Sequence, residues 1–403
     1  MHPQKLNASG ELWFYFCNPQ FWRYAIFQSG DTTTKYPSSE NRSEVQMRIA
    51  QVAPLYESVP PKYYGGTERI VSYLTEELVR RKHEVTLFAS GDSVTNARLV
   101  PITEEALRLQ GARVCDPIAH HVRLIEIALQ EASEFDIFHF HLDHIHFPLV
   151  RRTASVCLTT LHGRLDIPDL APLFQEFSEM PVVSISDSQR APLSWLNWCG
   201  TVYHGLPQSL YDFRETPDNY LAFLGRICPE KGVDRAIEIA EKTGCKLKIA
   251  AKVDPVDQKY FSDEIEPLLN RPLIEFIGEI GEEQKGEFLG RAAALLFPID
   301  WPEPFGLVMI EALACGTPVI AFDSGSVPEI VENGLTGFVV SDVDGAASAV
   351  EKLPTLSRRK CRETFEQRFS MSRMASDYLA IYRRLVSGYE GDAGGITVFR
   401  PAA

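Results

Sequence analysis

Short apolar runs alternate with segments of helical periodicity along most of this chain. Residues 47–54 (MRIAQVAP) have the length of a buried parallel strand and stop at a proline. After a loop rich in Pro, Tyr and Gly, apolar residues recur at helical spacing from Thr67 to the basic residues 80–82. Residues 84–89 (EVTLFA) form the next apolar run. This order predicts a β-loop-α-β unit that opens a doubly wound sheet.

The same alternation continues and later restarts. In the first half, further strands are predicted at residues 136–140, 156–161, 182–186 and 201–203, and helices at residues 118–130 and 188–196. After a turn-rich segment at residues 207–219, strands are predicted at residues 220–224, 246–250, 274–277, 294–297 and 318–322, and helices at residues 233–242, 258–269, 282–293 and 306–314. We therefore expect an α/β protein with two Rossmann-like doubly wound domains that face each other across a cleft. Ligands of such sheets bind at the carboxyl ends of the strands.

The expected domain limits follow from this pattern. The first domain is predicted at residues 47–210 and the second at residues 211–375. Residues 376–403 are expected to supply a C-terminal helix that packs back towards the first domain, and a tail.

The first 46 residues stand apart. Aromatic residues crowd between residues 12 and 27, but polar residues interrupt every apolar run, so the segment is too polar for a transmembrane span. It also lacks the cationic and apolar regions of a signal peptide. Two interpretations remain: an appendage or misassigned start, with Met47 opening the folded protein, or an aromatic segment that docks at a membrane interface or on the protein.

Composition narrows the class of protein. The chain has 403 residues and ordinary globular composition, with 40 Lys and Arg against 54 Asp and Glu, a formal net charge of -14. We expect no nucleic-acid partner, because such a surface is strongly basic, and any anion site must be local. The eight cysteines show no two-residue spacing typical of zinc or redox motifs, which favours a reduced, cytoplasmic setting. Cys157 and Cys315 lie in apolar stretches and are expected in the core.

Two glycine-containing loops are candidate anion sites. Gly65 and Gly66 open the first helix, where free N–H groups face a ligand, although a plain tight turn explains them equally well. The loop is not GxGxxG, so a nicotinamide dehydrogenase is disfavoured. In the second half, Arg226 and Lys231 follow a strand between glycines. Two cations at the carboxyl end of a strand are suited to gripping a diphosphate without a metal ion.

The most informative segment is DWPEPFGLVMIE at residues 300–311. Flanking prolines hold Glu303 in an extended loop just before a helix, and the N–H groups of Phe305, Gly306 and Leu307 are expected to point into the same space. Glu311 lies further along that apolar helix. A buried acid needs a partner, and a polyhydroxyl ligand would be one.

Together these motifs resemble one enzyme family. Glu303 and Glu311 form an E-x7-E motif, and EPFGLVMIEALACGTPVIA looks like the signature of the retaining, GT-B-fold glycosyltransferases of family 4. GGTER, TTLHG, FLGRICPEKG and SGSVPEIVENGLTGFVV are similar to other stretches of that family, so that the resemblance runs from Met47 to about residue 385. His204 departs from the family pattern, which commonly has Asn before this glycine.

The resemblance implies roles for particular residues. Arg226 and Lys231 would bind the donor diphosphate, and Glu311 would bind the ribose. Glu303 and the backbone of residues 305–307 would hold the transferred sugar. His162 would touch that sugar from the first domain, and Gly66 would approach the phosphate and the acceptor from the opposite wall. Catalysis would rest on Glu303, His162, Arg226 and Lys231.

Four histidines, His139, His141, His144 and His146, suggest a metal cluster at first sight. No metal or other cofactor is expected, because Arg226 and Lys231 can neutralise the phosphate. His141, at a strand end, is better interpreted as a residue lining the cleft. Tyr64, His141 and Arg164 are the candidates on the acceptor side, and Tyr64 belongs to a loop whose aromatic residues are as often packing as binding residues.

The predicted function is transfer of a hexose-type sugar from a nucleotide-diphosphate sugar to an acceptor hydroxyl, with retention. The acceptor is a carbohydrate, a lipid-linked molecule or a small molecule, and peripheral membrane contact is expected only for a lipid-linked one. The first domain would bind the acceptor and the second the donor. A nucleotide-sugar epimerase and a non-catalytic nucleotide-sugar-binding protein of the same fold are the alternatives.

Overall fold

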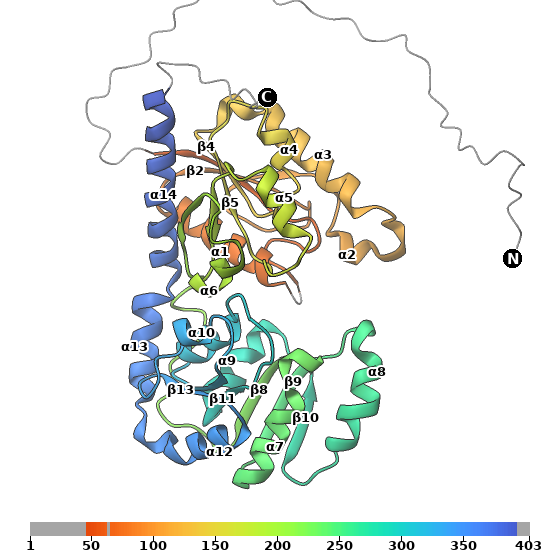
Figure 1. Cartoon of the computed structure of the whole chain (residues 1–403), viewed down its shortest axis with the longest axis vertical. Coiled ribbons are helices and arrows are strands. Elements are labelled where there is room, and N and C mark those ends of the chain that lie inside the picture. The colour runs from red at the N-terminus through yellow and green to blue at the C-terminus, as the bar shows by residue number, and fades with distance from the viewer. Residues whose placement is uncertain (1–45, 63–64, 393–403) are drawn as a thin grey trace, which may run out of the picture. The chain divides into compact units, whose positions relative to one another are not determined.

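A computed structural model describes residues 46–62 and 65–392 of the chain, and it consists of two α/β domains, each built on one parallel sheet (Figure 1). The N-terminal segment and Tyr64 lie outside these residues. Every strand pair within both sheets is parallel, which explains why most strands are apolar runs buried on both faces.

The first domain holds a seven-stranded sheet with the strand order β3-β2-β1-β4-β5-β6-β7. Its strands are β1 (Arg48–Val52), β2 (Glu84–Ala89), β3 (Arg98–Pro101), β4 (Ile137–Phe140), β5 (Cys157–Thr160), β6 (Val182–Ser184) and β7 (Trp198–Thr201). Its helices are α1 (Gly66–Arg80), α2 (Leu107–Gln110), α3 (Pro117–Gln130), α4 (Phe147–Val150), α5 (Leu170–Glu176) and α6 (Asp187–Arg190). Strand order reverses beside β1, so the carboxyl ends of β1 and β4 mark the topological switch point.

The second domain holds a six-stranded sheet with the order β10-β9-β8-β11-β12-β13. Its strands are β8 (Leu221–Arg226), β9 (Leu247–Lys252), β10 (Ile274–Gly278), β11 (Ala294–Phe297), β12 (Val319–Phe322) and β13 (Gly337–Val340). Its helices are α7 (Val233–Thr243), α8 (Gln258–Tyr260), α9 (Glu282–Arg291), α10 (Leu307–Ala314), α11 (Val327–Ile330), α12 (Val343–Lys352) and α13 (Arg358–Arg368). The two-domain parallel architecture predicted from the sequence is confirmed.

Most predicted elements occur within a few residues of their expected limits. The strand expected at residues 201–203 is instead β7, which ends at Thr201. The helix expected at residues 188–196 is the short α6 followed by a 3-10 turn that contains Pro192. Because the turn ends early, the chain extends into β7 sooner than the hydrophobic pattern indicated. Edge strands β3 and β13 were not predicted.

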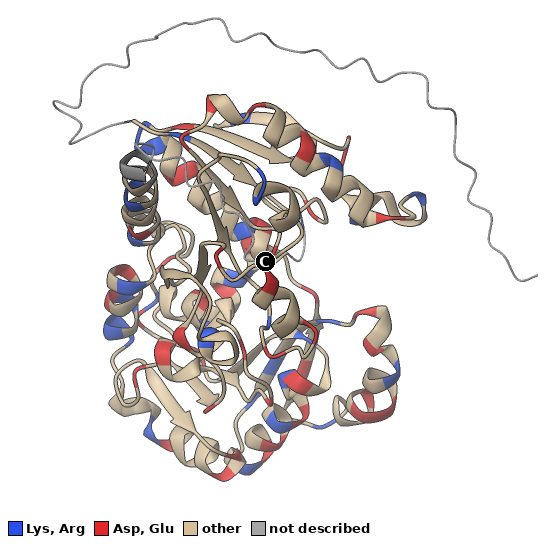
Figure 2. Ribbon diagram, turned by 45° about the horizontal axis from the view of Figure 1, so that its top comes forward, with Lys and Arg blue, Asp and Glu red and all other residues tan. Residues whose placement is uncertain are grey.

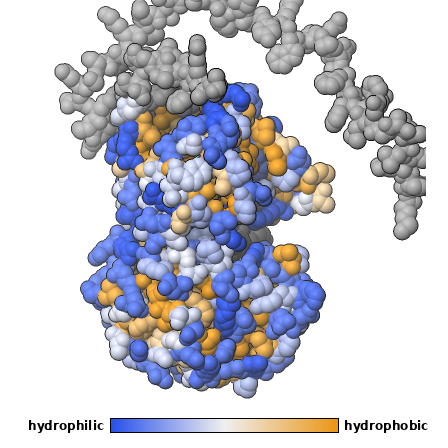
Figure 3. Space-filling view, viewed as in Figure 1, coloured by the Kyte–Doolittle hydropathy of each residue, from blue (hydrophilic) through white to orange (hydrophobic). Residues whose placement is uncertain are grey.

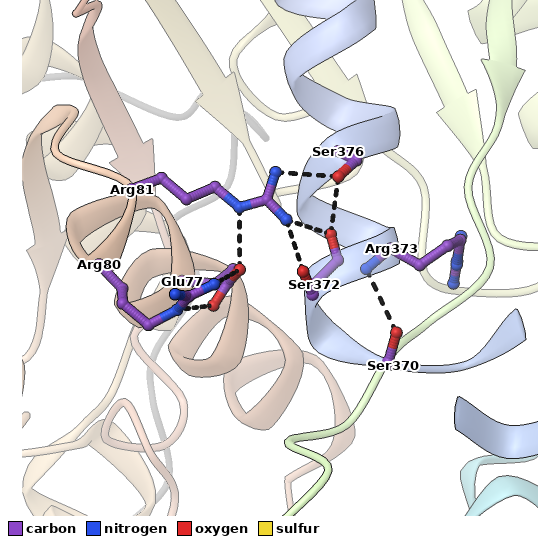
Figure 4. Close-up of polar contacts among 7 residues, drawn as sticks. All are labelled: Glu77, Arg80, Arg81, Ser370, Ser372, Arg373 and Ser376. Atoms are coloured by element: carbon purple, nitrogen blue, oxygen red, sulfur yellow. Dashed lines mark hydrogen bonds and ion pairs between the residues drawn. The ribbon is translucent and has the colours of Figure 1, made fainter. Parts of the chain in front are cut away.

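The last helix, α14 (Met371–Asp392), returns to the first domain and packs beside α1. Arg81, at the end of α1, donates to the hydroxyls of Ser372 and Ser376 at 2.8 and 2.9 Å, and its Nε donates to Glu77 (Figure 4). The start of α14 is thus fastened to the end of α1. Its next turns bring Tyr378 and Tyr382, both fully buried, against the first sheet.

The surface is mixed in character. Basic and acidic residues are interspersed along the described helices (Figure 2), and apolar residues occur in small patches between hydrophilic ones (Figure 3). Within the described ranges, no helix has both the length and the apolar character needed to span a bilayer. Cys157 and Cys315 are buried and unpaired, as expected for core residues.

Candidate active site

Lys231 and Glu303 contact each other through their side chains. Lys231 follows β8 and ends a 3-10 turn, and the next residue, Gly232, has a φ of 68° and is the N-cap of α7. The Lys231 ammonium contacts the Glu303 carboxylate, and the two side chains are only 19% and 11% exposed. The ammonium also lies 4.8 Å from the centre of the Trp301 ring. Two residues predicted separately, 72 positions apart, therefore form one charged centre.

A neighbouring loop holds Glu303 in place. Ser326 N–H donates to the Glu303 carbonyl at 3.0 Å, and its hydroxyl donates to the Phe305 carbonyl at 2.8 Å. The Ser324 hydroxyl donates to the Trp301 carbonyl at 2.6 Å. Gly325 has a φ of 58°, and a Cβ there would collide with the Glu303 backbone. The carboxylate is thus oriented by contacts that the E-x7-E motif did not reveal.

The start of α10 brings the two domains together. Gly306 is its N-cap with a φ of 79°, a conformation that suits glycine, and Phe305 is buried. Gly66 of the first domain lies close by, since a Cβ on it would be 3.6 Å from a methyl group of Leu307. The structure therefore places Gly66 beside Leu307, at the start of α10.

Arg226 lies among acids. Its guanidinium is 3.2 Å from Glu230, 3.6 Å from Asp254 and 3.5 Å from Asp257. Burial alone would lower the pKa of Arg226, but contact with Cys228 and the charges of Asp257 and Glu230 raise it above its ordinary value. The side chain stays cationic, and a diphosphate would have to replace carboxylates around it.

Glu311 has partners within the protein. Lys285 donates to it at 3.0 Å, and the Tyr211 hydroxyl lies 3.5 Å away. Burial alone would lower the pKa of Lys285, but Glu311 and Glu282 outweigh that effect and raise it. The expected partner of this buried acid is thus supplied by α9 and the interdomain link.

The same cluster connects the domains. Arg69 of α1 lies 2.5 Å from Glu282 of α9, and the Tyr211 hydroxyl also contacts Glu282. Burial raises the pKa of Glu282, but Lys285 and Arg69 outweigh it and lower the pKa. Arg69 stands in the GGTER motif, which was the only signal in the sequence for this contact. Glu282 and Lys285 carried none.

His162 lies in a row of ring contacts that crosses between the domains. Its ring centre is 5.5 Å from that of His204, which is 4.7 Å from Phe305. Its Nε2 is 2.9 Å from Nδ1 of His141. His141 is only 3% exposed, so it reaches this region through His162. Burial lowers the pKa of His162 to about 3 and holds that of His141 well below its ordinary value.

Arg164, a predicted acceptor-side residue, lies 5.6 Å from the centre of the Trp301 ring and pairs with Asp166 at 2.6 Å. It is therefore close to Lys231 and Glu303 across the domain boundary. Tyr64 belongs to the undescribed residues 63–64.

The histidines expected to mimic a metal cluster are used otherwise. Both ring nitrogens of His139 and of His141 have hydrogen-bond partners within the protein. His146 bonds to Thr159 at 2.8 Å. Across residues 46–62 and 65–392, no group of three or more His, Cys, Asp or Glu residues is arranged to hold a metal ion.

Two cavities lie away from these residues. One of about 410 Å³ is lined by residues including Arg48, His83 and Phe135. The other, of about 550 Å³, is lined by Ala171, Pro172, Gln175 and Trp195. Neither includes a predicted site residue, so we place the site by the contacts above and not by cavity size.

Two family models match the chain. Residues 64–200 match the model described as Glycosyltransferase Family 4, and residues 212–368 match the one described as Glycosyl transferases group 1. A glycogen synthase of Mycobacterium tuberculosis (strain ATCC 25618 / H37Rv) is 32% identical over 391 residues, which cover 82% of this chain and 91% of that protein. The chain therefore belongs to the family 4 glycosyltransferases.

Other relatives match more locally. An alpha-maltose-1-phosphate synthase of the same organism (strain CDC 1551 / Oshkosh) is 32% identical over 185 residues, 40% of this chain. The match covers 47% of that relative, so the chain spans about half its length. Among solved structures, Anabaena Alr3699/HepE in complex with UDP-glucose has a TM-score of 0.60 at 16% identity, over 86% of this chain and 100% of that one. This likeness shows the GT-B fold.

Proposed function

We propose that this protein is a retaining, metal-independent glycosyltransferase that moves a hexose-type sugar from a nucleotide-diphosphate sugar to an acceptor hydroxyl. The observation that carries the proposal is the contact between Lys231 and Glu303, with Gly66 of the first domain beside Leu307. A cation for a phosphate and a carboxylate for sugar hydroxyls thus lie together where the two domains meet. Family membership and the named activities of its relatives support the reaction class.

In this proposal the second domain binds the donor. Lys231 and Arg226 hold the diphosphate, and Glu311 binds the ribose after exchanging contacts with Lys285. Glu303 and the N–H groups of residues 305–307 hold the transferred sugar. That Anabaena HepE has been seen with UDP-glucose supports a nucleotide-sugar donor for this chain.

The first domain binds the acceptor and closes on the donor, excluding water that would hydrolyse the sugar. The acceptor hydroxyl attacks from the face that the diphosphate leaves, and the departing phosphate takes its proton. The sugar then keeps its configuration without a covalent enzyme intermediate. Lys231 and Arg226 stabilise the negative charge that develops on the leaving group.

We further propose a cytoplasmic setting without a nucleic-acid partner. All cysteines in the described part of the chain are free thiols, which supports a location in a reducing compartment. Membrane contact would be peripheral and would require a lipid-linked acceptor.

The test compares Lys231→Ala and Glu303→Ala with Lys242→Ala, an exposed lysine that pairs with Glu238 and Asp344. A panel of nucleotide sugars is screened for donor hydrolysis and transfer, with and without excess chelator. Losing a charge that stabilises the transition state costs on the order of 10² to 10³ in rate, so both site variants should lose turnover while the control keeps it. Urea unfolding checks that each variant folds.

Wild-type turnover in both site variants would contradict the assigned roles. Loss of activity in chelator, restored by a divalent ion, would contradict metal independence. The anomeric configuration of the product, read by NMR, tests retention, and donor incubated alone must not isomerise.

A further inference from the structure

A chain of buried polar side chains leads from α14 to His162. Gln51, His139 and Thr160 lie at the carboxyl ends of β1, β4 and β5, and each is 0% exposed. Gln51 and His139 are direct partners in the parallel ladder. Within strands that are otherwise apolar, these polar residues share one face of the sheet, and α14 covers it with Tyr378 and Tyr382.

Every link in this chain has good geometry. The Gln51 amide nitrogen is 3.2 Å from the Tyr382 hydroxyl, and the Gln51 amide oxygen is 2.9 Å from Nε2 of His141. Nδ1 of His141 is 2.9 Å from Nε2 of His162. On the other side, the Tyr382 hydroxyl is 2.7 Å from Nδ1 of His139. Buried polar groups are costly unless they are satisfied, and these are.

The position of each proton follows from donor and acceptor chemistry. The Gln51 oxygen can only accept, so Nε2 of His141 carries the proton. A neutral imidazole has one donor and one acceptor, so Nδ1 of His141 accepts, and Nε2 of His162 must donate to it. Burial lowers the pKa values of both histidines, which keeps them neutral near pH 7. Nδ1 of His162 is then left with a lone pair.

The Gln51 amide nitrogen faces the Tyr382 hydroxyl, and its oxygen faces His141. The amide NH₂ donates to the Tyr382 oxygen, and the Tyr382 proton is donated to Nδ1 of His139. Nε2 of His139 in turn donates to the Thr160 hydroxyl at 2.7 Å. Each group donates one hydrogen bond and accepts one, in the same order from His162 to Thr160. Turning the Gln51 amide around would therefore require every other group in this series to exchange its donor and acceptor roles.

We propose that Gln51 and His141 are positioning residues that hold His162 in its Nε2–H tautomer, so that Nδ1 accepts a hydrogen bond from a hydroxyl of the donor sugar. His162 is partly exposed, and its Nδ1 has no hydrogen-bond partner within residues 46–62 and 65–392. Nδ1 of His162 would thus accept a hydrogen bond from one sugar hydroxyl, and a sugar that lacks this hydroxyl would bind less well. This inference rests on the proposed function only for the identity of the ligand.

The first measurement uses the full chain without any donor. Nitrogen-15 labelling of histidine, with long-range ¹⁵N–¹H correlation spectra, shows which ring nitrogen of His162 carries the proton, and His162→Gln identifies its signal. We expect a single Nε2–H form in the wild-type protein. An Nδ1–H form there would overturn the proposal. This readout does not depend on activity, so it stands or fails separately from glycosyl transfer.

The second measurement removes the Gln51 amide oxygen, the hydrogen-bond acceptor that orients His141. Gln51→Met keeps the length of the side chain but lacks the amide, so Nε2 of His141 loses the oxygen that holds its proton. We expect Nδ1–H His162 to appear and the turnover of nucleotide sugar to fall on the order of tenfold to a hundredfold, as for an unpaired polar contact. Tyr382→Phe, which keeps the Gln51 oxygen but not its anchor, should give a mixture of tautomers.

The matched control is Arg81→Ala. It loosens the start of α14 without touching the chain, because Arg81 bonds to Ser372 and Ser376 (Figure 4). It should reduce stability while leaving the His162 tautomer and the turnover unchanged. If Gln51→Met retains a single Nε2–H tautomer with wild-type turnover, or if Arg81→Ala shifts the tautomer as much, the assignment is wrong.

Discussion

Single residues around Glu303 show how backbone conformation supports the site. Gly325 and Gly334 both have positive φ, 58° and 80°, but their surroundings differ. A Cβ on Gly325 would collide with the backbone of Glu303 and lie 2.7 Å from the carbonyl carbon of Pro302, whereas a Cβ on Gly334 meets nothing within 4 Å. A side chain at position 325 would therefore displace Glu303, whereas glycine at position 334 is favoured only by its own backbone conformation.

This contrast gives a prediction about Gly325→Ala, with Gly334→Ala as the control. Gly334→Ala should lose about 1 kcal/mol of unfolding free energy, because alanine is strained at positive φ. Gly325→Ala should lose more, because its Cβ would also meet the backbone of Glu303. Only Gly325→Ala should also displace the loop that carries Glu303 and reduce turnover of nucleotide sugar. Urea unfolding and turnover are measured for both. Equal turnover in the two variants would show that this loop does not orient Glu303.

At the residue scale, several charged residues of the candidate site could be predicted from the sequence. Lys231, Glu303 and Glu311 were recognised from their motifs, and the structure brings Lys231 and Glu303 into contact. Lys285, Glu282 and Tyr211 were not predicted, because they surround Glu311 from a helix and a link that are distant in sequence. Only the folded structure shows which polar and charged residues, unremarkable in the sequence, become partners of Glu311.

At the scale of elements, the strand ends of the first domain concentrate histidine. Burial lowers the pKa of His139, His141, His146, His162 and His204 near these strand ends, and also that of His83 and His121 elsewhere in the domain. Each is neutral in the folded protein and has an ordinary value near 6.5 in the unfolded chain. The fold therefore excludes protons that the unfolded chain binds.

The resulting prediction concerns stability against pH. Because the unfolded chain binds more protons below about pH 6.5, the unfolding free energy should fall as pH drops from 7.5 to 5. Each histidine contributes a slope of up to about 1.4 kcal/mol per pH unit, from 6.5 down to its folded pKa, which is about 3 for His162. Urea unfolding at a series of pH values measures the slope.

His146→Gln is the matched variant for that measurement. His146 bonds to Thr159 and lies outside the chain that leads to His162. Its replacement removes one group that takes up a proton on unfolding. The slope of unfolding free energy against pH should therefore fall by roughly 1.4 kcal/mol per pH unit between pH 5 and 6. A slope that is flat in the wild-type protein, or unaffected by this variant, would mean that the buried histidines do not control acid stability.

Elements were predictable to the extent that their periodicity was local. The buried strands read as continuous apolar runs, so β1, β4, β8 and β11 were found near their true limits. β3 was missed because it is a short edge strand whose end residues, Arg98 and Pro101, are exposed. The polar chain beneath α14 was missed for another reason: Gln51 and Tyr382 are 331 positions apart.

At the scale of the whole molecule, a few side chains join the domains. Arg69 contacts Glu282, and the carboxylate of Glu329 accepts from the N–H groups of Asp187 and Ser188, both at 2.7 Å. The Tyr203 hydroxyl also donates to Glu329 at 3.1 Å. These contacts tie helices of one sheet to helices of the other, so the relative position of the domains depends on buried or half-buried charge.

A double-mutant cycle tests how strongly Arg69 and Glu282 couple. With Arg69→Gln, Glu282→Gln and the double variant, we expect a coupling free energy of about 1–3 kcal/mol, since hydrogen bonds to charged groups that are shielded from water are worth this much. Urea unfolding provides the values. Lys242 and Asp344, an exposed pair in the second domain, should couple by less than about 1 kcal/mol.

Equal coupling in the two pairs would show that the interdomain contact is as weak as a surface one. The cycle would then give no support to Arg69 as a link between the two domains. Donor KM measured on the same variants separates a mechanical role from a purely stabilising one.

The return of α14 has a consequence for the order in which the protein is made. Gln51, His139 and Thr160 leave the ribosome early, but the tyrosine hydroxyls that satisfy them come from residues 378 and 382. At about 5–20 residues per second, the 331 positions between Gln51 and Tyr382 take roughly 17 to 66 s to synthesise. During that time the polar face of the nascent first domain is open to water, and this face of its sheet is covered only after α14 has been synthesised.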